Sequence, residues 1–69
     1  MIDGNRIRAL RVEQGFSQEE LADHAGIRPT MMGYIERGVK TTTADVLKRI
    51  ADKLGCTVDS LLRDTEATA

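Results

Sequence analysis

Side chains that can bond to nucleic-acid bases or phosphates recur at helical spacing between residues 28 and 37. At about 100° per residue, four positions share the outer side of a predicted helix: Thr30, Gly33, Tyr34 and Arg37. Hydroxyl and guanidinium groups can bond base edges, and arginine with guanine is the commonest specific pairing. The pattern therefore predicts a recognition surface. Its candidates for contact with bases, including the two residues at the helix start, are Arg28, Pro29, Thr30, Gly33 and Tyr34.

Groups suited to phosphate oxygens lie around this surface. Besides Gln18, treated below, the candidates are Ser17, Arg11, Arg37, Lys40, Thr41 and Thr42. For any single Lys or Arg, the alternative to phosphate contact is a charge that is simply solvated. We keep this second interpretation for Lys48 and Lys53. Gly33 leaves two alternatives open, because a glycine inside a helix costs about 1 kcal/mol relative to alanine. Either the backbone approaches DNA closely at this point, or the cost is simply tolerated.

The sequence contains few residues in patterns typical of catalytic sites. His24 is the only histidine and Cys56 the only cysteine, so neither can belong to a Cys–His pair at a recognised spacing or to a thiol-rich metal site. No glycine-rich phosphate loop and no metal-ligand spacing occurs. We therefore expect no enzyme activity, no catalytic residue, no metal and no cofactor. Cys56 is interpreted as a small packed residue, with a redox-sensing thiol as the alternative.

Two short helices joined by a tight turn must position the recognition surface. Ser17 and Glu20 have the spacing of a capping box, in which each side chain satisfies a backbone donor of the other residue. Gly26 suits the left-handed backbone at a helix end, and Pro29 suits the first turn of the next helix. Two helices separated by about three residues with a glycine in the turn describe a helix-turn-helix.

Three further helices are predicted around this pair. The first runs from Asn5 to about Glu13, and the second follows a cap at Thr42 or Thr43. The second has an apolar stripe of Val46, Leu47, Ile50, Ala51 and Leu54. A short last helix is capped by Thr57 and closed by Arg63. The sequence thus predicts an all-α fold of five short helices, with residues 1–63 as one domain and residues 64–69 as a flexible polar tail.

Composition sets limits on partners and location. The chain has 69 residues and a net charge of −1, so a basic surface must be local rather than spread over the whole molecule. No apolar run approaches the roughly 20 residues needed to span a membrane, and residues 1–10 lack the apolar core of a signal peptide. We expect a cytoplasmic protein with no membrane partner.

Several short motifs, in this order and at this spacing, carry a resemblance to a known family. They are IRALR (7–11), SQEELA (17–22), the AGI turn (25–27), YIERG (34–38), and LKRIADKLGC followed by VDSLL (47–62). With them the chain resembles the Cro/C1-type (XRE-like) helix-turn-helix family of bacterial and phage transcriptional regulators. The resemblance implies a compact, lambda-repressor-like five-helix domain. It also implies sequence-specific binding to double-stranded operator DNA, usually as a homodimer, with no small-molecule ligand evident.

The resemblance also assigns roles to individual residues. Gln18 matches a position that commonly contacts the DNA backbone and braces the recognition helix, and the helix N–H groups beside it also suit a phosphate oxygen. Arg11 and Glu36 match positions that often form a salt bridge between the first and third helices. Two departures stand out. The usual Ser or Thr cap of the recognition helix is Arg28, which cannot accept a hydrogen bond, and Pro29 replaces a residue that often reads a base.

A protein-interaction module, such as an antitoxin-like or anti-repressor domain, is the alternative function. The near-neutral charge favours it slightly, and the two functions differ in salt response, because phosphate contacts weaken steeply with salt. For a homodimer, Val58, Leu62 and the loop before residue 43 offer a small self-complementary patch. A monomer that pairs only on DNA fits equally well.

Overall fold

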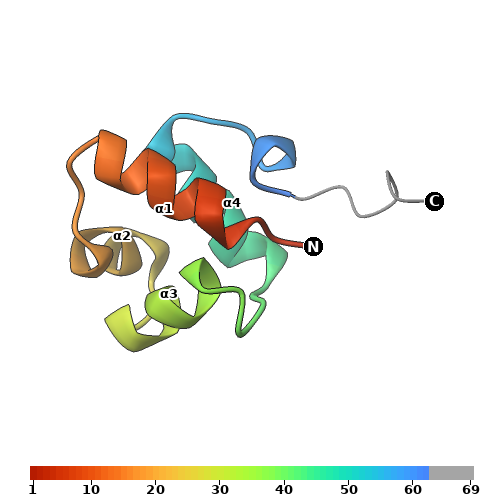
Figure 1. Cartoon of the computed structure of the whole chain (residues 1–69), viewed down its shortest axis with the longest axis horizontal. Coiled ribbons are helices and arrows are strands. Elements are labelled where there is room, and N and C mark those ends of the chain that lie inside the picture. The colour runs from red at the N-terminus through yellow and green to blue at the C-terminus, as the bar shows by residue number, and fades with distance from the viewer. Residues whose placement is uncertain (63–69) are drawn as a thin grey trace.

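Four α-helices and one 3₁₀ turn account for the regular structure of residues 1–62, the part of the chain that the computed structural model describes (Figure 1). In chain order they are α1 (Gly4–Glu13), α2 (Gln18–Ala25), α3 (Pro29–Glu36), α4 (Ala44–Leu54) and the 3₁₀ turn η1 (Asp59–Leu61). The all-α prediction is confirmed. No helix within residues 1–62 combines the length and apolar character needed to cross a membrane.

The predicted fifth helix is wrong in its length. Thr57 does act as a cap, since its hydroxyl accepts the backbone N–H of Ser60 at 3.2 Å. Only the single turn η1 follows it before the described residues end. Arg63, predicted to close the helix, and the predicted tail at residues 64–69 lie outside the described residues.

Backbone pairing with the N-terminal segment explains why η1 is so short. Leu62 leaves the turn with extended dihedrals, φ −102° and ψ 139°, and forms an antiparallel bridge with Ile2. One residue further, the Asp3 N–H donates to the Leu61 carbonyl at 2.7 Å. A second helical turn would need these same backbone groups within the helix, so the pairing ends the helix at Leu61.

The ends of the long helices follow local rules. Asp3 caps α1, with its carboxylate 3.2 Å from the backbone nitrogen of Arg6. Thr43 rather than Thr42 caps α4. Gly26 ends α2 with φ +76°, a left-handed conformation that glycine adopts without the penalty imposed by a Cβ.

The core lies between α2, α3 and α4, with α1 packed on α3 and on η1. Its buried hydrophobic residues are Ile7, Leu21, Ala22, Ala25, Met32, Ile35, Leu47, Ile50, Ala51, Leu54 and Leu61. Val12 stays outside this core and is 55% exposed. At Gly4, a Cβ would lie 2.5 Å from the backbone oxygen of Glu36. Only glycine therefore lets the start of α1 approach the end of α3 this closely.

Candidate nucleic-acid interface

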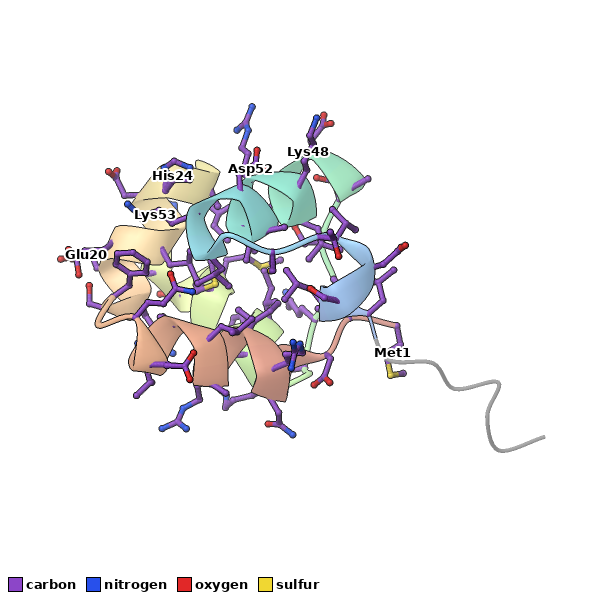
Figure 2. All side chains as sticks on the ribbon, turned by 90° about the horizontal axis from the view of Figure 1, so that it is seen from above. Met1, Glu20, His24, Lys48, Asp52 and Lys53 are labelled. Carbon is purple, nitrogen blue, oxygen red and sulfur yellow. The ribbon has the colours of Figure 1, made fainter. Side chains whose placement is uncertain are left out.

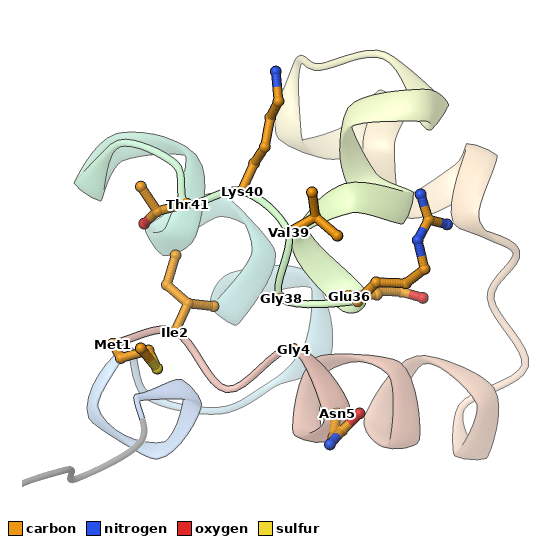
Figure 3. A pocket seen from close by; sticks show the side chains of 10 residues that line it. Met1, Ile2, Gly4, Asn5, Glu36, Gly38, Val39, Lys40 and Thr41 are labelled. Atoms are coloured by element: carbon orange, nitrogen blue, oxygen red, sulfur yellow. The ribbon is translucent and has the colours of Figure 1, made fainter.

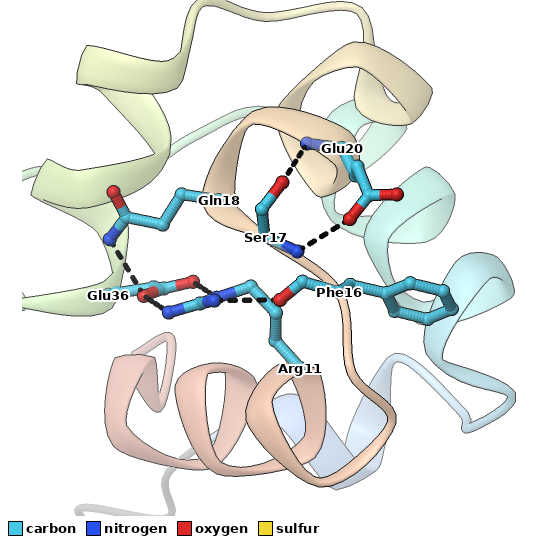
Figure 4. Close-up of polar contacts among 6 residues, drawn as sticks. All are labelled: Arg11, Phe16, Ser17, Gln18, Glu20 and Glu36. Atoms are coloured by element: carbon cyan, nitrogen blue, oxygen red, sulfur yellow. Dashed lines mark hydrogen bonds and ion pairs between the residues drawn. The ribbon is translucent and has the colours of Figure 1, made fainter.

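The start of α2 is closed by the predicted capping box. The Ser17 hydroxyl accepts the Glu20 backbone N–H at 3.0 Å, and the Ser17 N–H donates to the Glu20 carboxylate at 2.9 Å (Figure 4). The Ser17 backbone N–H, then its hydroxyl and the charge of Lys53 hold the pKa of Glu20 below its ordinary value. The capping box leaves the backbone N–H groups of Gln18 and Glu19 for an outside acceptor, because the first donors of a helix have no partner within it.

The start of α3 carries the exposed base-reading candidates. Arg28 is the N-cap, and its side chain makes no capping bond. Pro29 occupies the first turn, and Arg28, Pro29 and Thr30 are all exposed. The predicted arrangement of these residues is therefore present, with the Arg28 guanidinium uncommitted to the helix that it begins.

A buried carboxylate joins α3 to both helices before it. Glu36 accepts the Arg11 Nε at 2.7 Å, the Arg11 Nη2 at 3.1 Å and the Gln18 Nε2 at 3.0 Å (Figure 4). The side chains of Arg11 and Glu36 are only 11% and 1% exposed. The predicted salt bridge is thus present. With Gln18 it forms a three-residue unit, the Glu36 cluster (Glu36, Arg11, Gln18), which ties α1, α2 and α3 together.

Membership of the Glu36 cluster changes the interpretation of Arg11. Its third nitrogen, Nη1, donates to the carbonyl of Phe16 at 2.8 Å. All three guanidinium nitrogens are therefore bonded inside the protein, and Arg11 orients α3 rather than standing ready for a phosphate. The resemblance implied that Gln18 braces the recognition helix, but it did not name Glu36 as the partner, because no local pattern brings residues 18 positions apart into contact.

Gly33 is buried in the structure, under two side chains. A Cβ at this position would lie 3.3 Å from the Arg37 Nη1 and 3.6 Å from the Gln18 Oε1. The two alternatives considered for Gly33 were close approach to DNA and no requirement at all. The geometry supplies a third reason for glycine, which is space for these two polar groups.

The other phosphate candidates lie in the chain that leaves α3. Arg37 is the C-cap of α3, and Arg37, Lys40 and Thr41 are exposed while Thr42 is half-buried. This loop and the N-terminal residues line an open hollow of about 500 Å³, whose rim includes Met1, Val39 and Thr41 (Figure 3). Cationic and hydroxyl groups therefore gather at the C-terminal end of α3 and on the loop that follows it.

Several polar residues of α2 and α4 lie outside this set of candidates. His24 projects from α2, and Lys48 and Asp52 project from α4 (Figure 2). Lys53, expected to be solvated, instead has its ammonium 4.6 Å from the centre of the Phe16 ring. Cys56 is partly buried against the core, as interpreted from the sequence.

The fold and these contacts define a helix-turn-helix domain whose second helix, α3, offers an exposed N-terminal turn. The chain belongs to the Cro/C1-type helix-turn-helix family, because the helix-turn-helix family model matches residues 7–61.

Known proteins agree with this assignment. The HTH-type transcriptional regulator YazB of Bacillus subtilis is 40% identical over 58 residues, covering 84% of each chain. The solved structure of the biofilm regulator SinR in complex with DNA is 34% identical, with a TM-score of 0.78 over 87% of this chain and 97% of that one. The P22 c2 repressor with a synthetic operator is 27% identical, with a TM-score of 0.85 over 91% and 96% of the two chains.

Other relatives are longer than this chain. The matched region spans 60% of the curated SinR of Bacillus subtilis, which is 33% identical over 66 residues. It spans only 11% of the regulator RamB of Mycobacterium tuberculosis.

Proposed function

We propose that this domain binds double-stranded DNA in a sequence-specific manner, acts as a small transcriptional regulator and catalyses no reaction. The observation that carries the proposal is the Glu36 cluster, which holds α3 rigidly against α1 and α2 while leaving Arg28 and Thr30 exposed. In a helix-turn-helix, the second helix lies in the major groove with its N-terminal residues at the base edges. Such docking requires an α3 whose start is free and whose end is anchored.

Within this function we assign base reading to the outer side of α3. Arg28 would contact a guanine edge, and Thr30 would hydrogen-bond a base or pack on a thymine methyl group. Pro29 can offer only apolar contact, and Tyr34 would reach a base edge or a phosphate. Gly33 is left out of this set because it is buried beneath Arg37 and Gln18.

Phosphate contacts would come from both helices and the following loop. We assign them to the backbone N–H groups at the start of α2 and to these side chains: Gln18, Arg37, Lys40, Thr41 and Thr42. Ser17 contributes by shaping that helix start, since its own N–H and hydroxyl belong to the capping box. Such contacts position a protein on the duplex, whereas base contacts specify the sequence.

A homodimer on a two-fold symmetric operator would complete the recognition. Val58 is half-buried and Leu62 is 41% exposed, so both leave apolar surface that a second copy would cover. The two copies of α3 would then be separated by about 34 Å, one turn of the duplex. We further propose that residues 1–63 form the binding unit and that it acts in the cytoplasm, where its DNA would be.

Gel-shift titration with the DNA upstream of this protein's own gene, at two salt concentrations, tests the proposal. We expect a shift that weakens steeply with salt, because bound phosphates release counterions. Arg28→Ala should weaken binding to the shifted site by about 1–3 kcal/mol and relax its specificity. Lys48→Ala, an equal loss of charge at an exposed position of α4 outside the candidate set, is the matched control and should change little.

Two results would contradict this assignment. Absence of any shift at low salt, for this DNA and for a pool of random duplexes, would favour the interaction module over DNA binding. Equal affinity of the Arg28→Ala variant and the unchanged protein would remove Arg28 from the site. Circular dichroism of each variant checks that the helices are intact.

A further inference from the structure

Tyr34 has two cations against its ring. The guanidinium carbon of Arg37 lies 5.3 Å from the ring centre, and the ammonium of Lys40 lies 5.4 Å from it. Both distances fall within the roughly 6 Å over which a cation is attracted to an aromatic face. Tyr34 is half-buried, so its ring is held in place by the protein while the two cations remain exposed.

The backbone after α3 explains how Lys40 reaches this ring. Gly38 has φ +76° and turns the chain back. The N–H groups of Val39 and Lys40 then donate to the carbonyl of Tyr34 itself, at 2.9 and 3.4 Å. The residue that supplies the ring thus also anchors the loop that brings Lys40 beside it.

The missing side chain at Gly33 explains the position of Arg37. The Arg37 Nη1 lies 3.3 Å from where a Cβ of Gly33 would be, and the Gln18 amide lies next to the same point. Arg37 therefore crosses the outer side of α3 at residue 33. The result is a continuous polar strip from the start of α2, across α3, to the loop after it.

Neither cation is neutralised within the described chain. The ion pair found among residues 1–62 joins Arg11 to Glu36, and the Glu36 carboxylate is buried and committed to the Glu36 cluster. Two positive charges held at one ring repel each other, and an anion placed between or beside them relieves that repulsion. The arrangement therefore favours a negative group from outside.

We infer that Tyr34 is a positioning residue whose ring holds Arg37 and Lys40 together as a two-cation anchor for a DNA phosphate. This inference rests on the proposed DNA-binding function. For Tyr34 it replaces the direct contact assigned above, through the hydroxyl, by positioning of the two cations through the ring. Arg and Lys side chains lose much rotamer freedom when they bind. Holding both against the ring before binding lowers that loss.

Nuclear magnetic resonance of the free protein tests the geometry without DNA. The ring current of Tyr34 should shift the δ-methylene protons of Arg37 and the ε-methylene protons of Lys40. Tyr34→Phe should keep both shifts, and Tyr34→Leu should abolish them. Unshifted methylene protons in the unchanged protein would overturn the inference, whatever the protein binds.

Fluorescence anisotropy with a mixed-sequence DNA duplex tests the effect on binding, because phosphate contacts do not depend on the operator. Tyr34→Leu should weaken binding about 5- to 20-fold. This is the loss of affinity expected when two weak cation–ring contacts no longer hold the cations in place. Tyr34→Phe should stay within about twofold of the unchanged protein. In an Arg37→Met/Lys40→Met background, Tyr34→Leu should have no more than about a twofold effect, since the groups it positions are gone.

Other results of the binding experiment would show which part of the inference is wrong. An equal loss for Tyr34→Phe and Tyr34→Leu would mean that the hydroxyl contacts DNA directly. An undiminished Tyr34→Leu effect in the Met/Met background would mean that the ring acts on DNA by itself. Either result overturns the anchor but not DNA binding, whereas a failure of the unchanged protein to bind any duplex overturns the proposed function. Lys53→Met, which removes a cation from the ring of Phe16, is the charge-matched control and should leave affinity unchanged.

Discussion

Replacing Arg11 with methionine tests how strongly the Glu36 cluster depends on its cation. Methionine is similar in length and fills the space, but it has no donor. Glu36, with its side chain 1% exposed, would keep only the bond from Gln18. Removing one partner of a buried ion pair costs about 3–5 kcal/mol, because the other charge is left uncompensated. A domain of this size is stable by roughly 3–10 kcal/mol in total, so Arg11→Met should remove a large part of its free energy of unfolding.

The structure also predicts an asymmetry between the two partners. Glu36→Gln should cost less, about 1–3 kcal/mol, because Arg11 is 11% exposed and keeps its bond to the Phe16 carbonyl. The double variant Arg11→Met/Glu36→Leu leaves no buried charge and should recover most of the loss, as replacement of buried pairs by apolar residues often does.

Urea denaturation followed by far-ultraviolet circular dichroism measures these free energies of unfolding. The difference between Arg11→Met and the unchanged protein should persist at high salt, since buried pairs are poorly screened. A loss below about 1 kcal/mol for Arg11→Met, the value of an exposed ion pair, would refute the reasoning. Glu36 would then be reached by water in solution. Greater damage from Glu36→Gln than from Arg11→Met would refute the predicted asymmetry.

Three further variants test single contacts. Gly4→Ala should destabilise the fold by more than about 1 kcal/mol, because its Cβ would press on the α3 carbonyls. Urea denaturation measures this loss, and an unchanged midpoint would contradict the close approach of the two helices. Gly33→Ala should keep or raise stability by up to about 1 kcal/mol, since only the flexible end of Arg37 must move, and a marked loss would show that the site cannot adjust. Glu20 has a lowered pKa in the folded state, so its ionised carboxylate stabilises the fold. This contribution is complete above the pKa of Glu20 in the unfolded chain, about 4. It disappears as the pH falls through the lower pKa of the folded state. Thermal melting from pH 6 to pH 3 should therefore change less in Glu20→Gln than in the unchanged protein, and identical curves would exclude this contribution.

The helix boundaries could be predicted because they depend on neighbours in the chain. The Ser17–Glu20 capping box and the left-handed glycines at Gly26 and Gly55 act over four residues or fewer. The spacing of apolar residues indicated which side of α4 is buried. Arg11 and Glu36 were paired only through the family resemblance, since no local rule joins positions 25 apart.

Predictions failed where the outcome depended on distant parts of the chain. The last helix shortened to η1 because Leu62 pairs with Ile2 at the other end of the described chain. Lys53 lies over the ring of Phe16 although its position in α4 predicted a solvated charge. Such contacts carry no signal in local propensity or periodicity.

The sequence by itself determined where the four α-helices begin and end, and it placed Arg28 and Thr30 at the start of α3. Caps, turns and amphipathic spacing are short-range, so they can be read residue by residue. Only the tertiary structure decided which polar groups are committed inside the protein and which remain free. It buried Glu36 with Arg11 and Gln18, and it left Arg37 and Lys40 exposed at the ring of Tyr34. The physical reason is that burial and charge pairing depend on distances between helices, which packing alone sets.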